Sequence, residues 1–114
     1  MRKAARQLPP TLSHQWIDLV DLMAHRAMAR KIRRQPALFN RAARNIARWE
    51  KSNRGCPAPL REWKQILSEN KMGQVLRLMT RSDEEGNRLR QSSPFCGILT
   101  ARERKALWAH YDQG

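Results

Sequence analysis

The chain has 114 residues, a length that fits one domain with a modest core. Its 23 Lys and Arg residues outnumber 10 Asp and Glu residues, and the formal net charge of +13 predicts a polyanion or an acidic protein surface as the partner. No apolar run approaches the roughly 18 residues of a transmembrane helix, and Leu8-Pro9-Pro10 stands where an export signal needs an apolar stretch. We therefore expect a cytoplasmic protein without membrane contact.

The first predicted helix covers about residues 13–34 and follows a flexible basic arm over residues 1–11. Apolar residues recur in it at three- and four-residue steps, which is typical of an amphipathic helix whose stripe faces the core. The stripe consists of Leu12, Trp16, Leu19, Val20, Met23, Ala27 and Met28. Asp18, Asp21, His25 and Arg30 fall outside it.

Proline residues and turn formers divide the rest of the chain into shorter helices. Pro36 predicts the start of a second helix that reaches about Lys51 and buries Phe39, Ala42, Ala43, Ile46 and Trp49. A linker over residues 52–59 leads to helices over 60–69 and 73–80, and Ser82 with Glu85 predicts the cap of a helix that ends near Gln91. The fold class is therefore all-α, with residues 12–114 in a single irregular bundle of about five to six helices.

The stretch from Arg88 to Arg104 combines several constraints. Pro94 excludes Ser93 from helical conformation, and an apolar loop with Phe95, Ile98 and Leu99 around Gly97 is expected to fold onto the body. Thr100 with Glu103 forms a reciprocal capping pattern that starts a last helix over about 101–111. We expect Phe95 to anchor this loop while Arg88 and Arg90 project outward.

The second helix also predicts a basic face. Its members recur at three- and four-residue steps, so that they line one side of the helix: Arg41, Arg44, Arg48 and Lys51, with Asn45 beside them. Such a face can follow a phosphate backbone, and Asn45 can read a base edge. The alternative is a solvated polar face, although four cations without an interleaved acid repel one another.

Catalysis is not predicted. His14, His25 and His110 lie in separate segments without a metal-binding spacing, Ser92 and Ser93 lack the turn of a hydrolase nucleophile, and no phosphate-binding glycine loop occurs. Cys56 and Cys96 have no Cys or His partner at ligand spacing, so both are interpreted as reduced core residues. We expect a protein that is not an enzyme and needs no cofactor or metal.

Three segments of the stretch from Arg88 to Arg104 share one resemblance: Arg88-Leu-Arg-Gln-Ser-Ser-Pro-Phe95, Gly97-Ile-Leu-Thr100 and Glu103-Arg104. They resemble a motif of small bacterial helical proteins that look like antitoxin partners of toxin–antitoxin or defence modules. His25-Arg26, Pro36 and Asn45-Ile-Ala-Arg-Trp49 are also similar to that group. The resemblance implies binding and neutralisation of a toxin-like partner protein through Arg88, Arg90, Ser92, Ser93, Phe95 and Arg104. The alternative is a DNA- or RNA-binding protein or transcriptional regulator that uses the basic helix over residues 36–51.

Overall fold

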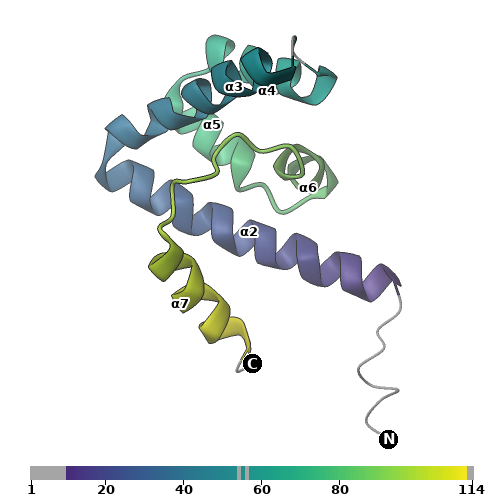
Figure 1. Cartoon of the computed structure of the whole chain (residues 1–114). Helices are drawn as coiled ribbons and strands as arrows, with labels where there is room; N and C mark the ends of the chain where they lie inside the picture. The colour runs from purple at the N-terminus through teal and green to yellow at the C-terminus, as the bar shows by residue number, and fades with distance from the viewer. Residues whose placement is uncertain (1–9, 54, 56, 113–114) are drawn as a thin grey trace, which may run out of the picture.

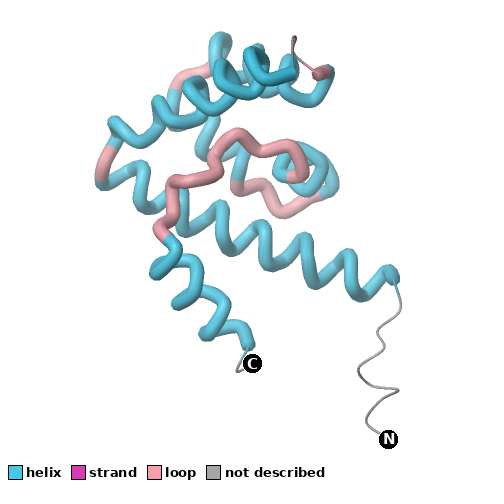
Figure 2. Tube along the Cα trace, viewed as in Figure 1, coloured by secondary structure: helices cyan, strands magenta, loops and turns pink. Residues whose placement is uncertain are grey.

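Every regular element in the described part of the chain is a helix (Figures 1 and 2). The computed structural model describes residues 10–53, 55 and 57–112. Its elements are α2 (Pro10–Arg34), the 3-10 helix η1 (Pro36–Phe39), α3 (Asn40–Asn53), α4 (Ala58–Glu69), α5 (Met72–Met79), α6 (Glu84–Arg90) and α7 (Ala101–Asp112). The predicted all-α bundle of five to six helices is confirmed. The predicted arm lies outside the described residues, apart from Pro10 and Thr11, which belong to α2.

The helix ends follow the capping chemistry of the sequence with two corrections. Thr100 and Glu103 cap α7 reciprocally as predicted, since Thr100 N donates to Glu103 Oε1 at 2.8 Å and Glu103 N donates to Thr100 Oγ1 at 3.1 Å. Pro36 starts a 3-10 turn before α3 instead of an α-helix. The cap of α6 is Asp83 and not Ser82, because the Asp83 carboxylate accepts from Gly86 N at 2.9 Å.

Side chains from α2, α3, α4, α5, α6 and the loop before α7 form one core. Trp63 and Phe95 are fully buried, and their rings meet edge to face with centroids 5.7 Å apart. The Trp63 indole N–H donates to the Leu89 carbonyl at 2.9 Å, so this ring also has its polar atom satisfied. Ile98 is buried beside Phe95 in the same cluster. The predicted packing of the apolar loop onto the body is confirmed.

Apart from Met28, the predicted apolar stripe of α2 is not the face that packs on the body. The buried residues recur at three- and four-residue steps on the other side of the helix: Leu22, His25, Ala29 and Ile32. Within the predicted stripe, Trp16 is 45% exposed and Leu19 is 43% exposed. The prediction was wrong because it counted His25 as a solvent-facing polar residue, whereas its ring is buried and hydrogen bonded.

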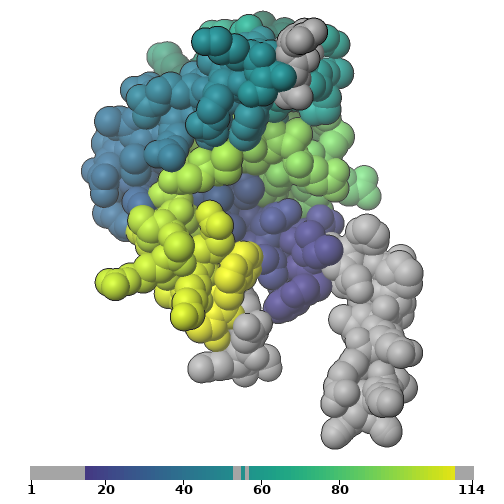
Figure 3. All heavy atoms as spheres, in the orientation of Figure 1, coloured from purple at the N-terminus to yellow at the C-terminus, as the bar shows by residue number. Residues whose placement is uncertain are grey.

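The last helix leaves the body and lies beside α2. Lys31 of α2 donates to the Ile98 carbonyl at 2.8 Å and pairs with Glu103 at 2.7 Å, which fixes the start of α7. From there α7 extends toward the N-terminal half of α2 while diverging from it (Figure 1). In the space-filling view both helices lie at the lower edge of the molecule (Figure 3).

Candidate functional site

The loop between α6 and α7 is held by a buried amide. Asn45 is 2% exposed, and its side-chain nitrogen donates to the carbonyls of Pro94 at 2.8 Å and Cys96 at 3.0 Å. Because both contacts lie inside the fold, Asn45 cannot reach a base edge. Its predicted role as a base reader is therefore corrected to that of a loop anchor.

Two arginines of the predicted basic face also support this loop. Arg48 donates to the Asn45 side-chain oxygen at 3.0 Å and so orients the amide. The guanidinium of Arg41 lies over Gly97, where a Cβ atom would approach Arg41 Nε to 2.8 Å. Gly97 has a φ of +89°, a conformation that favours glycine. The α3 cations are exposed as predicted, but Arg41 and Arg48 have structural contacts as well.

A second buried polar contact joins α2 to the same loop. His25 is 5% exposed, its Nδ1 lies 2.8 Å from the Asp21 carbonyl and its Nε2 lies 2.8 Å from Ser93 Oγ. A carbonyl only accepts, so Nδ1 carries the proton and Nε2 accepts from the Ser93 hydroxyl. Burial lowers the pKa of His25 to about 4, which keeps the ring neutral. The half-buried Ser93 is therefore committed to a structural hydrogen bond.

Arg90 lies inside the protein and does not project outward as predicted. It is 4% exposed, and its guanidinium donates to the carbonyls of Met79 at 3.1 Å and Arg81 at 2.6 Å and to Asn87 Oδ1 at 2.6 Å. Met79 is the last residue of α5, so the cation sits at the negative end of that helix. Arg90 is a helix cap here, and no partner can contact it from solvent.

Arg88 does project outward, but its guanidinium is occupied. It donates to both carboxylate oxygens of Glu62 at 2.8 Å and to Glu85 at 2.6 Å and 3.1 Å. These hydrogen bonds raise the pKa of Arg88 and lower the pKa of Glu62 and Glu85. The pairing lies on the surface between α4 and α6, where such ion pairs contribute little to stability.

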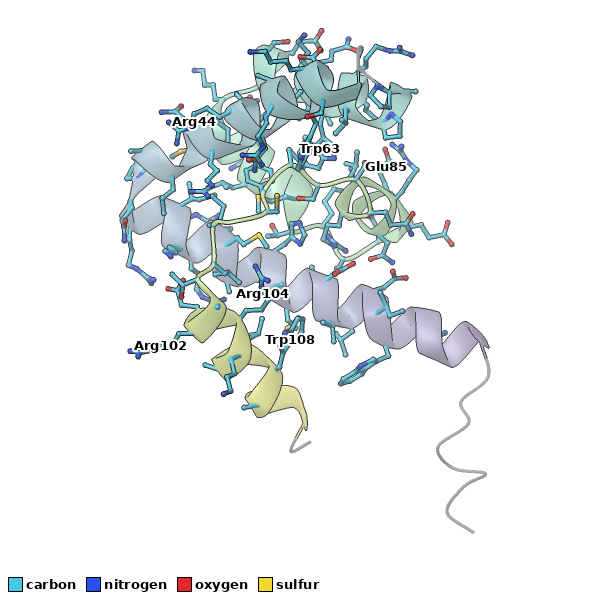
Figure 4. The ribbon with its side chains drawn as sticks, in the orientation of Figure 1. Arg44, Trp63, Glu85, Arg102, Arg104 and Trp108 are labelled. Carbon is cyan, nitrogen blue, oxygen red and sulfur yellow. The ribbon has the colours of Figure 1, made fainter. Side chains whose placement is uncertain are left out.

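The structure does not assemble the predicted partner-binding residues into one contact surface. Phe95 is fully buried as the core anchor, so its predicted contact with a partner is corrected. Ser92 is half-buried and lines a surface hollow with Arg88 and Gln91 beside α4. Arg104 is exposed on α7 and lies on the side of that helix that faces α2 (Figure 4). No binding residue of this set is brought next to Arg104.

A surface of exposed cations runs from the end of α2 along the length of α3. None of its members forms an ion pair with a described carboxylate, and we call them the basic surface: Arg30, Arg33, Arg34, Arg41, Arg44, Arg48 and Lys51. The opposite side carries carboxylates of α6 and its cap, where hydrogen bonds from Arg88 and Arg81 lower the pKa of Glu85 and Asp83. Figure 4 shows Arg44 and Arg102 on one side of the molecule and Glu85 on the other.

Other chemistry receives no support from the described residues. No group of three or more His, Cys, Asp or Glu residues among them is placed to hold a metal ion. Cys96 is an exposed free thiol, which corrects its predicted place in the core, and Cys56 lies outside the described residues. None of the described helices combines the length and the apolar composition that crossing a bilayer requires.

Comparison with known proteins adds no relative. No family model, no curated protein and no solved structure matches this chain. The candidate function therefore rests on the geometry and the charge of the chain itself.

Proposed function

We propose that this protein binds nucleic acid through the basic surface. The observation that carries the proposal is the set of exposed cations on α3 and the end of α2 that form no ion pair with a described carboxylate. Like charges on adjacent helical turns repel one another, so a bound polyanion stabilises such a surface.

The spacing along α3 suits a phosphate backbone. Arg41 and Lys51 are ten residues apart, which corresponds to about 15 Å along a helix. That length covers roughly four steps of a single DNA strand at 3.4 Å per step. Arg provides most of the cations, and its planar guanidinium matches phosphate oxygens in a forked geometry.

In the proposed binding mode the protein contacts the phosphate backbone of the nucleic acid more than its bases. Lys and Arg contacts to phosphate position a protein on nucleic acid without reporting base identity. Asn45, which was the predicted base reader, donates to the Pro94 and Cys96 carbonyls instead. We therefore expect little discrimination among sequences of equal length.

The test is a salt titration of a variant that removes only surface cations. Arg44 and Lys51 are exposed and form no hydrogen bond or ion pair with another described residue, so Arg44→Gln with Lys51→Gln should leave the fold intact. Arg41 and Arg48 are avoided because they contact Gly97 and Asn45. The matched control, Lys71→Gln with Arg77→Gln, removes the same charge from exposed positions on α5 and its cap.

If the proposal is right, the α3 double variant flattens the dependence of log K on log salt by about 0.7 to 0.9 per lost phosphate contact. The α5 variant leaves that slope close to the parent value. Equal slopes in both variants would mean that the attraction is diffuse and that α3 is not the binding surface.

A second candidate is neutralisation of a partner protein, the antitoxin-like role that the resemblance implies. The observation that favours it is a pair of exposed apolar side chains on one face of α2, namely Trp16 and Leu19. Such a role would give a stoichiometric complex with weak salt dependence, whereas nucleic-acid binding weakens steeply with salt. Both roles are proposed for the cytoplasm, as predicted from the sequence, and a bacterial source is what the resemblance implies.

A further inference from the structure

The helix α2 has a second apolar face, opposite to the face that packs on the body. Its members recur at three- and four-residue steps: Trp16, Leu19, Val20, Met23 and Ala27. At the C-terminal end of this face, half-buried Ala27 lines a groove of about 350 Å³ together with Leu99, Ala106 and Leu107. The N-terminal end is open, since Trp16 is 45% exposed and Leu19 is 43% exposed.

The helix α7 extends this face into a concave surface. Arg104 and Trp108 lie one turn apart on the side of α7 that faces α2 (Figure 4). Trp108 and Leu107 are only half-buried, so the angle between the helices is lined with apolar surface that the described residues leave partly open. A helix of 12 residues spans about 18 Å, whereas the 25 residues of α2 span about 37 Å, so α7 cannot cover the whole face.

The rim of this surface is cationic toward the C-terminal end of α2. Arg30 and Arg34 line the groove from α2, and Arg104 is exposed on α7. The groove carboxylate, Glu103, is already paired with Lys31 at 2.7 Å. An occupant must therefore bring apolar side chains for the centre and carboxylates for the rim.

We propose that the face formed by α2 and α7 binds an acidic amphipathic helix of a partner protein. A helix with apolar residues along one stripe and Glu or Asp on its flanks meets both requirements. The proposal deepens the second candidate function, on which it rests. It shares Arg30 and Arg34 with the basic surface but uses none of the cations of that surface that lie on α3.

Charge and shape favour an acidic helix over three other occupants, namely a second copy of the chain, residues 1–9 and a membrane. A second copy of the chain would bring the same cations to the rim, and residues 1–9 contain Arg2, Lys3 and Arg6 without an acid. Both would repel the rim. An anionic membrane matches the charge, but Ala27, Leu99 and Leu107 at the C-terminal end of the face line a hollow that a flat bilayer cannot enter.

The test uses a fluorescently labelled synthetic helix with a leucine stripe and glutamate flanks, and the full chain. We expect binding that weakens about tenfold or more for Trp16→Ala with Leu19→Ala, because a buried Trp is a common interface anchor. Ile17→Ala is the matched control. Ile17 is 54% exposed but lies about a quarter turn from Trp16, off the stripe, so this change should alter affinity less than twofold.

A second pair of variants keeps the apolar residues intact. Arg30→Gln with Arg104→Gln should weaken the binding of the acidic peptide, and a control peptide with lysine flanks should remain unbound. Arg44→Gln with Lys51→Gln should leave the binding of the acidic peptide unchanged. Circular dichroism checks that each variant is folded.

Three results would overturn the inference: equal binding of the glutamate and lysine peptides, no effect of Trp16→Ala with Leu19→Ala, or binding to anionic lipid vesicles without binding to the peptide. Self-association in sedimentation that this double variant abolishes would assign the face to a dimer instead. Nucleic-acid binding is measured on the same variants, so that failure of peptide binding can be distinguished from failure of the function proposed for the basic surface.

Discussion

The buried imidazole of His25 makes the stability of the protein depend on pH in a definite direction. In the native state Nδ1 donates to the Asp21 carbonyl and Nε2 accepts from Ser93, so a second proton on the ring would reverse the hydrogen bond to Ser93 and place a charge inside the fold. Burial lowers the pKa of His25 from 6.5 to about 4. The unfolded chain, by contrast, protonates at the ordinary value.

The sign and size of the effect follow from these two pKa values. Above pH 6.5 both states hold a neutral ring, and His25 contributes no pH dependence. Between pH 6.5 and about 4 the unfolded state binds a proton that the native state excludes, so stability falls as the pH falls. At about 1.4 kcal/mol per pKa unit, the loss is complete below about pH 4 and amounts to about 3 kcal/mol.

Urea unfolding between pH 7 and pH 4 measures this loss, and His25→Gln provides the control. Glutamine can accept from Ser93 but does not titrate in this range. Carboxylates such as Glu103, whose pKa is lowered by the hydrogen bond from Lys31, lose their contribution at lower pH in both proteins. Asp21 has a raised pKa through burial and acts in the opposite direction. The difference between the two curves therefore isolates His25.

The reasoning fails if the parent and His25→Gln lose the same stability between pH 7 and pH 4. Parallel curves would mean that the native ring accepts a proton as readily as the unfolded chain. They would also remove Ser93 as the partner of a neutral imidazole.

Three further predictions concern stability and are checked by thermal or urea unfolding. Arg90→Ala should destabilise the protein by about 3 to 5 kcal/mol, because it leaves carbonyls of α5 and its C-terminal turn unpaired. Arg88→Ala should destabilise it by no more than about 1 kcal/mol. Similar losses of stability in both variants would place Arg90 at the surface. Phe95→Ala should cost about 3 to 5 kcal/mol, since it empties the centre of the core, and a loss below about 1 kcal/mol would contradict that position. Gly97→Ala should destabilise more than an ordinary surface change, because of its φ of +89° and the overlying Arg41; a neutral effect would show that the guanidinium moves away freely.

The sequence was sufficient to predict those helix boundaries and that buried loop whose signals lie within a few neighbouring residues. Pro36 and Pro94 separate helices, Thr100 with Glu103 begins α7, and Phe95 with Ile98 marks a loop that must be buried. Each of these effects acts over a few residues, so neighbouring positions in the chain contain the whole signal.

The buried polar residues could not be predicted in the same way. Asn45 looks like part of a charged helical face, and Arg90 looks like a surface cation. Their burial depends on carbonyls of Pro94 and Met79, which other segments bring into place. A polar side chain is buried when a partner is present, and residue type does not reveal the partner. One signal was available for His25: it shares helical spacing with Leu22 and Ile32.

This distinction decides how functional variants of the loop before α7 must be interpreted. The carbonyls of Pro94 and Cys96 accept from Asn45, and the carbonyl of Ile98 accepts from Lys31, so the loop is tied to both α3 and α2. A change in this loop therefore disturbs the basic surface and the α2–α7 face together. Loss of nucleic-acid and peptide binding in parallel with a lower melting temperature reports on folding. A binding function is assigned only by a variant that weakens one ligand, keeps the other and leaves the melting temperature unchanged, and the exposed side chains on α3, α2 and α7 meet that condition.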